Sequence, residues 1–202
     1  MSEGESGGFL AAWQRVARRI RVPLGFVAAA VYLWQLWMHR PQWIPMAWSL
    51  ALVLPGLWLR GYAAGYVKKN SELTMTGPYA HVRNPLYLGS ILIAAGFAVA
   101  LMSWPFAAVL VGFFLLIYVP VIASEERFLR GEFLEFEWYC ARVPRLIPRL
   151  TPARAPDARP GSAGRFSWEL YRKHREYNAA IGATLLYGSL LLGVLVHAKM
   201  GR

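Results

Sequence analysis

The polar residues best suited to chemistry lie in three short segments that are far apart in the chain. They are Gly77-Pro78-Tyr79-Ala80-His81-Val82-Arg83-Asn84-Pro85-Leu86-Tyr87-Leu88-Gly89, the acidic pair Glu125-Glu126, and Tyr139-Cys140-Ala141-Arg142-Val143-Pro144-Arg145-Leu146-Ile147-Pro148. Together they supply carboxylates, guanidinium groups and phenols. Such groups bind the charged parts of a small molecule, and a carboxylate can also take up a proton.

Each of these segments also has a purely structural interpretation. Asn is a preferred N-cap and Pro is preferred in a first helical turn, so Asn84-Pro85 predicts a helix start, whose free N–H groups also suit a carboxylate or phosphate. Glu125 and Glu126 fit the beginning of a solvated helix, yet a carboxylate at a membrane boundary is costly unless it has a partner. Arg142 suits a lipid phosphate as well as an acceptor group. The residues alone leave these alternatives open.

Metal, disulfide and dinucleotide chemistry are not expected. His81 has no His or Cys three or four residues away, which disfavours a metal site. Cys140 is the single cysteine, so it cannot form an intrachain disulfide, and we expect it on a helix face. The chain contains no Gly-x-Gly tripeptide, which excludes the glycine fingerprint of dinucleotide-binding domains.

The composition indicates a membrane protein. Only 16% of the 202 residues are charged, against about 25% in soluble domains. The segments that contain no Asp, Glu, Lys or Arg are 22–38, 43–59, 86–102, 104–123 and 179–196. We therefore predict an all-α, polytopic membrane protein with five transmembrane helices.

The distribution of basic residues predicts how the chain is oriented. Of the 22 Lys and Arg residues, only Arg40, Lys199 and Arg202 fall on the outer side if the N-terminus is cytosolic. The net charge of +11 is thus explained by positive-inside topology and by contact with anionic lipid headgroups, without a nucleic-acid partner. We expect a cytosolic N-terminus, cytosolic motif segments and a C-terminus on the opposite side. The first eight residues are polar and acidic, so no cleaved presequence is expected.

The connections between the spans predict which segments meet. Only Ser103-Trp104-Pro105 joins the third and fourth spans, so they must form an antiparallel hairpin that brings 77–89 and 125–126 to one membrane face. Pro55-Gly56 predicts a kink, and Pro120 removes one helix hydrogen bond. Amphipathic interfacial helices are expected at 9–21, 124–140 and 166–178, and a surface linker at 144–164.

The domain organisation follows from these elements. We expect residues 1–21 to form a disordered tail and an interfacial helix, and 22–150 to form a core of four spans that carries the motifs 77–89, 125–126 and 139–148. Residues 151–202 are expected to add a linker, an amphipathic helix and an extra C-terminal span.

In their order and spacing, the three motif segments resemble the membrane methyltransferases of the isoprenylcysteine carboxyl methyltransferase family, which are related to the membrane phospholipid methyltransferases. The resemblance covers roughly residues 75 to 150. It implies a helical membrane enzyme that binds S-adenosylmethionine at the cytosolic face and methylates a lipophilic acceptor. This chain departs from the family at Asn84, where His is usual, and in its extra C-terminal span.

The resemblance also implies roles for individual residues. The cofactor would be held by Tyr79, His81, Arg83, Asn84, Pro85, Tyr87, Leu88, Gly89, Glu125, Glu126 and Tyr139. The two glutamates would meet its charged end, Arg142 would lie beside the acceptor, and Glu126 would be the second catalytic residue. No metal is implied.

Methyl transfer from a sulfonium is compatible with so few titratable groups, because it depends mainly on positioning in a dry cleft. The acceptor group could be a carboxylate, an amine or a thiol. Two other functions remain: an NAD(P)H-dependent membrane reductase of the sterol reductase type, and a non-catalytic protein that binds lipid.

Overall fold

The computed structural model describes residues 27–68, 72–153 and 164–199, and these residues form helices and loops without strands. The all-helical class is thereby confirmed for this part of the chain. The helices are Val27–Met38, α2 (Trp43–Ala64), the 3-10 helix η1 (Gly77–Ala80), α3 (Pro85–Leu101), α4 (Trp104–Phe113), the π-helical turn η2 (Phe114–Tyr118), α5 (Val119–Glu132), α6 (Phe136–Arg142), α7 (Trp168–Lys173) and α8 (Tyr177–Lys199).

Within the described residues, three helices are long and apolar enough to cross a membrane. They are Trp43–Ala64, Trp104–Glu132 and Tyr177–Lys199, with mean hydropathies of 1.2, 2.7 and 2.1. Val27–Met38 and Pro85–Leu101 are apolar but shorter. The number of five spans therefore stays a prediction. The expected helix at 9–21 and the start of the first expected span lie outside the described residues.

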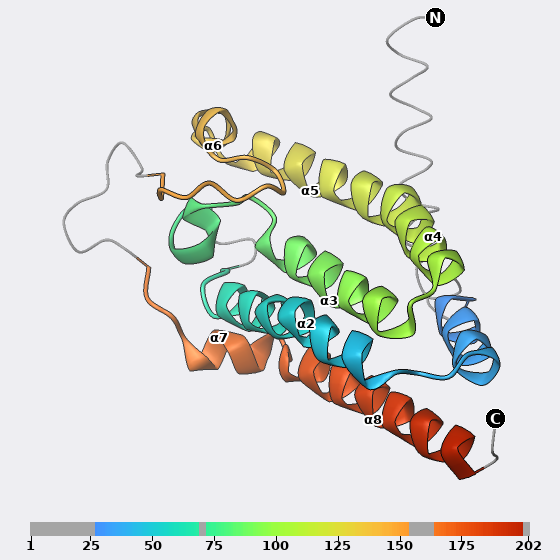
Figure 1. The fold of residues 1–202 in the computed structure, drawn as a ribbon. Coiled ribbons are helices and arrows are strands. Elements are labelled where there is room, and N and C mark those ends of the chain that lie inside the picture. The colour runs from blue at the N-terminus through green and yellow to red at the C-terminus, as the bar shows by residue number, and fades with distance from the viewer. Residues whose placement is uncertain (1–26, 69–71, 154–163, 200–202) are drawn as a thin grey trace, which may run out of the picture.

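The expected hairpin is formed by α3 and α4, which run in opposite directions (Figure 1). Met102 ends α3 in the left-handed region, with φ 49°. The hydroxyl of Ser103 then caps α4 by accepting a hydrogen bond from the Phe106 N–H at 3.2 Å. The short link turns the chain and places the start of α3 and the end of α5 at the same end of the bundle.

A continuous helix runs from α4 through the π-helical turn into α5 (Figure 1). The π turn, Phe114–Tyr118, comes directly before Val119-Pro120. Proline has no N–H to donate, so the expected loss of a helix hydrogen bond coincides with a local change of helix type.

The sequence predicted one amphipathic helix over 124–140, but the structure divides this stretch between α5 and α6. Phe133 leaves the helical region with φ −127° and ends α5. The chain then turns into α6, and this lets Phe136 and Tyr139 pack with Val143 in a small core of their own, each at most 2% exposed.

Helices α2 and α3 pack closely through glycines. A Cβ on Gly89 would lie 2.7 Å from the Gly56 carbonyl oxygen, and one on Gly96 would lie 2.4 Å from Cγ2 of Val53. Helix α2 stays helical through Pro55. Since no side chain fits between the two helices at these points, the start of α3 is held firmly against the end of α2.

The polar segments gather at one end of the bundle, where α6, η1 and α7 lie in Figure 1. Part of the expected linker 144–164 is attached here, because residues 144–153 run beside 80–83. The backbone N–H of Arg83 donates to Pro144 O at 2.9 Å, that of Arg149 to His81 O at 3.0 Å, and that of Ala153 to Ala80 O at 2.9 Å. Residues 154–163 lie outside the described part.

Candidate functional site

A polar pocket of about 420 Å³ lies at this end of the bundle, between the end of α2, the start of α3, α5 and α6. Its lining includes both acidic and basic groups. Of the residues expected at the site, it contains Tyr79, Arg83, Asn84, Pro85, Tyr87, Glu125, Glu126 and Tyr139. The three motif segments therefore do converge, as the hairpin predicted.

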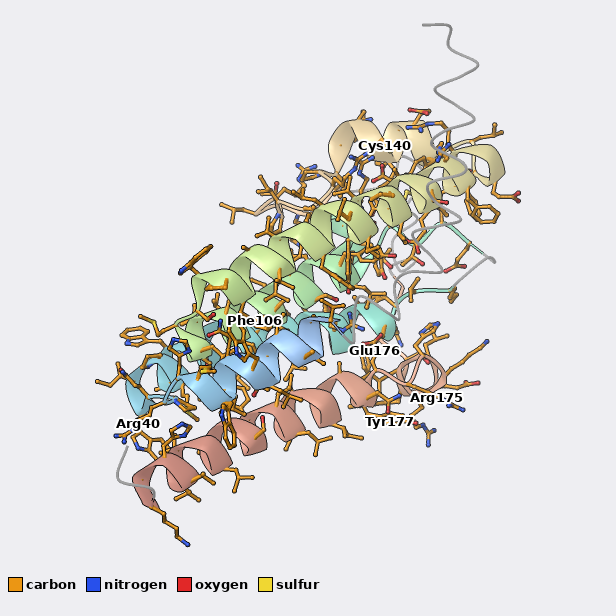
Figure 2. All side chains as sticks on the ribbon, turned by 90° about the vertical axis from the view of Figure 1, so that its right-hand side faces the viewer. Arg40, Phe106, Cys140, Arg175, Glu176 and Tyr177 are labelled. Carbon is orange, nitrogen blue, oxygen red and sulfur yellow. The ribbon has the colours of Figure 1, made fainter. Side chains whose placement is uncertain are left out.

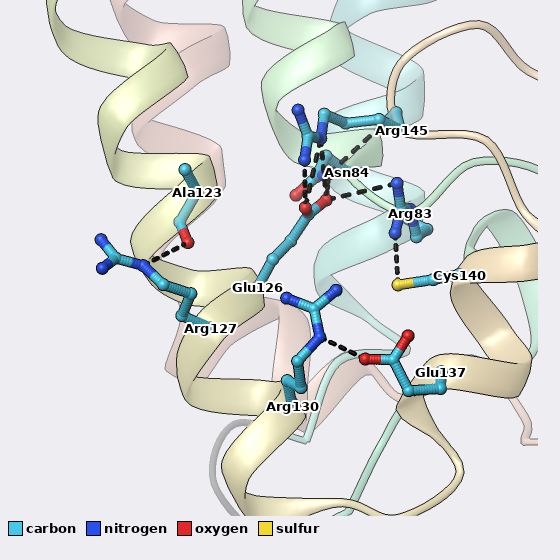
Figure 3. Close-up of polar contacts among 9 residues, drawn as sticks. All are labelled: Arg83, Asn84, Ala123, Glu126, Arg127, Arg130, Glu137, Cys140 and Arg145. Carbon is cyan, nitrogen blue, oxygen red and sulfur yellow. Dashed lines mark hydrogen bonds and ion pairs between the residues drawn. The ribbon is translucent and has the colours of Figure 1, made fainter. Parts of the chain in front are cut away.

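Glu126 is the buried centre of this convergence, with only 5% of its surface exposed. Its carboxylate accepts hydrogen bonds from Asn84 Nδ2 at 3.3 Å and from the guanidinium of Arg145 at 2.6 to 3.2 Å. Arg83 lies 3.7 Å away on another side (Figure 3). The hydrogen bond to Glu126 raises the pKa of the Arg145 guanidinium. Glu126 thus ties the third motif segment to the start of α3.

Asn84 strengthens the same junction. Besides Glu126, its side-chain amide donates to the backbone carbonyl of Arg145 at 3.2 Å. Asn84 precedes α3 as expected, but its side chain makes no capping hydrogen bond to the helix. Its amide instead serves the contact between segments.

Arg83 lines the pocket, and the three nitrogens of its guanidinium lie in different surroundings. One of its terminal nitrogens donates to the sulfur of Cys140, and another faces Glu126. Its Nε is buried and has no hydrogen-bond partner among the described residues. Buried donors nearly always have a partner. An acceptor oxygen from a bound molecule would supply one here.

Glu125 differs from its neighbour Glu126 in being exposed. Its Oε1 accepts a hydrogen bond from the Tyr87 hydroxyl at 2.8 Å, and the Tyr87 ring packs edge-on against Tyr118, with centroids 5.3 Å apart. Glu125 therefore presents a carboxylate to the pocket from a position fixed by α3. Of the two glutamates that line the pocket, it is the exposed one.

Two buried tyrosines form another part of the wall. The Tyr139 hydroxyl donates to the Tyr79 carbonyl oxygen at 2.7 Å. Burial raises the pKa of both phenols above the ordinary 10.0, so both stay protonated near neutral pH.

The structure adds Arg60 and Glu176, which the sequence reasoning missed. Arg60 donates from Nε and Nη2 to both carboxylate oxygens of Glu176 at 2.8 to 3.1 Å, and from Nη1 to Leu86 O at 3.3 Å and to the Ser90 hydroxyl. Both charged residues line the pocket. Each is the first charged residue next to an apolar segment on the expected cytosolic side. This position in the sequence could have identified both as candidate site residues.

Four expected residues do not line the pocket. His81 contacts Arg149 O through Nδ1 at 2.9 Å, Gly89 packs against α2, and Leu88 is absent from the lining. Arg142 is exposed, with its guanidinium 4.4 Å from the centre of the Trp138 ring. Arg145, three residues later, makes the contact with Glu126, because the chain turns at Val143-Pro144 after α6 ends.

Among the described residues, no group of three or more His, Cys, Asp or Glu side chains is arranged to hold a metal ion. Figure 3 shows the carboxylate of Glu126 surrounded by arginine and asparagine side chains instead.

Comparison with known proteins agrees with the geometry. The model of the family described as phospholipid methyltransferase matches residues 44–135. The nickel-cobalt-cadmium resistance protein NccN of Alcaligenes xylosoxydans xylosoxydans is 34% identical over 148 residues, which cover 68% of each chain. The cobalt-zinc-cadmium resistance protein CzcN of Cupriavidus metallidurans is 40% identical over 95 residues, 47% of this chain and 43% of that protein.

No solved structure matches the chain. The family match begins in α2 and ends after α5, so it includes the hairpin, the first motif segment and both glutamates. The chain belongs to the phospholipid methyltransferase family, as the resemblance of its motif segments predicted.

Proposed function

We propose that this protein is an S-adenosylmethionine-dependent methyltransferase that acts on a lipophilic acceptor at the cytosolic membrane face. The observation that carries the proposal is the polar pocket at the end of a bundle of apolar helices, most of whose lining residues fall in the region that matches the family. The pocket opens where the polar motif segments meet, while the helices behind it expose large apolar side chains such as Trp48, Trp58 and Leu185. Such surfaces suit contact with lipid.

The pocket residues fit the charges of the cofactor. When bound, S-adenosylmethionine supplies a methyl group on a positively charged sulfur, from which a nucleophile can take it. Arg83 offers its unpartnered Nε–H to a carboxylate, and Glu125 offers its exposed carboxylate to an ammonium group. Tyr79 and Phe136 add aromatic surface to the lining. We propose that these residues, with Tyr87, hold the cofactor.

Glu126 has a different part in this proposal. Its oxygens already accept hydrogen bonds from Asn84 and Arg145, so it is poorly placed to accept a proton from a substrate. We assign it the positioning of the first and third motif segments. An amine or thiol acceptor releases a proton when it is methylated, and because Glu125 is assigned to the ammonium group of the cofactor, that proton passes to water.

The names of two relatives connect those proteins with resistance to nickel, cobalt, zinc and cadmium. We propose that this chain works in a related setting by modifying a lipophilic molecule. The described residues place carboxylates beside arginines and tyrosines, which suits an organic ligand better than a metal ion.

Calorimetry with S-adenosylhomocysteine tests the cofactor directly, using purified protein in nanodiscs. Saturable heat that is unchanged by EDTA is the expected result. NADPH, titrated in parallel, should give no heat, because the family match favours methyl transfer over a reductase. Heat with NADPH and none with S-adenosylhomocysteine would overturn the proposal, and heat with neither would favour a non-catalytic lipid-binding protein.

The acceptor is identified in a second experiment. Incubation of the protein with radiolabelled S-adenosylmethionine and a membrane lipid extract should transfer label to one lipid-soluble fraction.

A further inference from the structure

A second cavity, of about 710 Å³, lies among the apolar helices and opens at the surface, where Leu33 and Leu185 of its lining are exposed. Its walls come from Val27–Met38, α3, α4 and α8, with Tyr32, Phe97, Phe106 and Leu186 among the lining residues. Figure 2 labels Phe106 within the bundle and Glu176 with Tyr177 at the end of α8 nearer α7, whereas Arg40 lies at the opposite end. The cavity volume falls in the range of about 300–1,000 Å³ that is typical of sites for small ligands.

The walls of this cavity are almost entirely apolar. The hydroxyl of Tyr32, its most buried polar group, is 3.0 Å from Leu186 O and 2.7 Å from the Ser189 hydroxyl, so it is already satisfied within the wall. In the part of the chain that the structure describes, Arg60 is the one charged residue of the lining. A ligand in this space would meet carbon along most of its length and, among the described residues, a charged group only near Arg60.

Arg60 and Ser90 line both cavities. Arg60 is therefore at the junction where the apolar cavity approaches the polar pocket. A molecule whose apolar part fills the first space has its polar end directed toward the second. Such an arrangement is what methyl transfer to a lipophilic acceptor requires.

The state of Arg60 restricts the polar end of that molecule. A guanidinium has five N–H donors, and Arg60 makes five hydrogen bonds, three to Glu176 and one each to Leu86 O and Ser90. Its charge is neutralised by Glu176, whose side chain is only 11% exposed. An anionic group would have to displace this carboxylate, so the junction is poorly suited to a carboxylate or a phosphate.

We propose that the 710 Å³ cavity binds the apolar chain of the methyl acceptor, with a non-anionic nucleophile such as an amine or a thiol at the end near Arg60. This assignment rests on the proposed methyltransferase function and adds to it the location and chemical class of the acceptor. It also gives α8 a role, since Gly182, Leu186 and Ser189 of that helix form one wall.

Two glycines of α8 allow a matched test. An added Cβ meets no other atom within 4 Å at Gly182 or at Gly188, so neither position resists a larger side chain by contact. Gly182 lines the cavity, whereas Gly188 is exposed and does not. Gly182→Leu should fill part of the cavity, and Gly188→Leu controls for the cost of replacing a helical glycine.

The probe is hexadecylamine that carries a photoactivatable diazirine in mid-chain, and its crosslinks are mapped by mass spectrometry. We expect labelling of peptides that contain cavity residues, at least a fivefold loss in Gly182→Leu, and no loss in Gly188→Leu. Excess unlabelled hexadecylamine should compete, and palmitate should compete at least tenfold less well. Labelling that is unchanged in Gly182→Leu, or equal competition by palmitate, would overturn the inference.

Calorimetry with S-adenosylhomocysteine on the same three proteins separates this inference from the proposed function. Unchanged heats in all three, with cavity labelling lost only in Gly182→Leu, support both. Normal heats without cavity labelling overturn the acceptor site alone. Absent heats in the unmodified protein overturn the methyltransferase proposal and, with it, the assignment of the cavity to a methyl acceptor.

Discussion

Arg145 Nη2 lies 2.6 Å from Glu126 Oε2, and this ion pair joins the segment after α6 to the middle of α5. Glu126 is nearly fully buried, whereas half of the Arg145 side chain is exposed. The pair thus joins a buried carboxylate to a guanidinium that is partly exposed at the surface.

Glu126→Gln should destabilise the fold. The amide cannot accept from Arg145 and Asn84 as a carboxylate does, and it leaves nearby guanidinium charge uncompensated. Loss of such a buried, charged hydrogen bond costs about 1–3 kcal/mol. A lowered transition temperature in fluorescence-detected size exclusion would show it. Glu137→Gln, which breaks the exposed ion pair with Arg130, is the control and should leave that temperature unchanged.

Glu125→Gln should weaken binding of S-adenosylhomocysteine without affecting the fold. Glu125 is exposed and hydrogen-bonded to Tyr87, so its removal leaves no buried charge behind. Loss of a charged hydrogen bond to the ligand predicts a decrease of about 1.5–3 kcal/mol in binding free energy by calorimetry. Glu132→Gln, an exposed acid at the end of α5, should bind as the unmodified protein does. Equal affinities in the two variants would assign Glu125 to the helix surface.

Arg145→Lys should be more harmful than Arg142→Lys. Lysine offers a point charge where the Arg145 guanidinium makes several bonds to Glu126. Arg142 lies over the Trp138 ring at the surface, and lysine preserves much of that contact. We expect lower thermal stability and activity for Arg145→Lys and near-normal values for Arg142→Lys. A tenfold loss of turnover in Arg142→Lys alone would restore that residue as the acceptor contact.

Arg60 and Glu176 should show a favourable coupling energy. The pair connects α2 to the segment before α8 by a two-pronged contact at 2.8 to 3.1 Å. A double-mutant cycle with Arg60→Gln and Glu176→Gln should give about 1–3 kcal/mol of coupling in the free energy of unfolding. A value near zero would show that α8 is held by its apolar face alone.

High pH should unfold the polar end of the protein. Burial raises the pKa of Tyr79 and Tyr139 above 10.0 in the folded state, so folding favours the protonated phenols. Their contribution to stability is complete below about pH 10 and is lost as the pH rises further. Tyrosinate absorbance and gel filtration should show ionisation together with loss of compactness. Tyr139→Phe should reduce the dependence on pH, because it removes one of the two buried phenols.

The apolar helices and the hairpin could be predicted because their signals are local. A long segment without charged residues indicates a helix in lipid. Asn84-Pro85 marks where a helix starts, and Ser103-Trp104-Pro105 marks where the chain turns. The meeting of 77–89 with 125–126 follows from that hairpin without further information.

Side-chain direction could not be predicted in the same way. Arg142 and Arg145 are three residues apart, and which of them reaches Glu126 depends on how the chain leaves α6 at Val143-Pro144. The breaking of 124–140 at Phe133 depends on the separate core that Phe136 and Tyr139 build. Arg60 and Glu176 are 116 residues apart, and their pairing needs the position of α8. Each of these features is set by tertiary packing.

The π-helical turn at Phe114–Tyr118 makes the helix that carries both glutamates tolerant of a change in length at one place. A π turn closes its hydrogen bonds over one more residue than an α turn does. Deleting Leu115 should let this turn relax to α-helix and leave Glu125 and Glu126 on their present faces. Deleting Ala123 within α5 should instead rotate both glutamates by about 100° about the helix axis. The Glu126 carboxylate would then point away from Arg145 and Asn84. The length of the apolar part before the π turn can therefore change without rotating the part that carries the two glutamates.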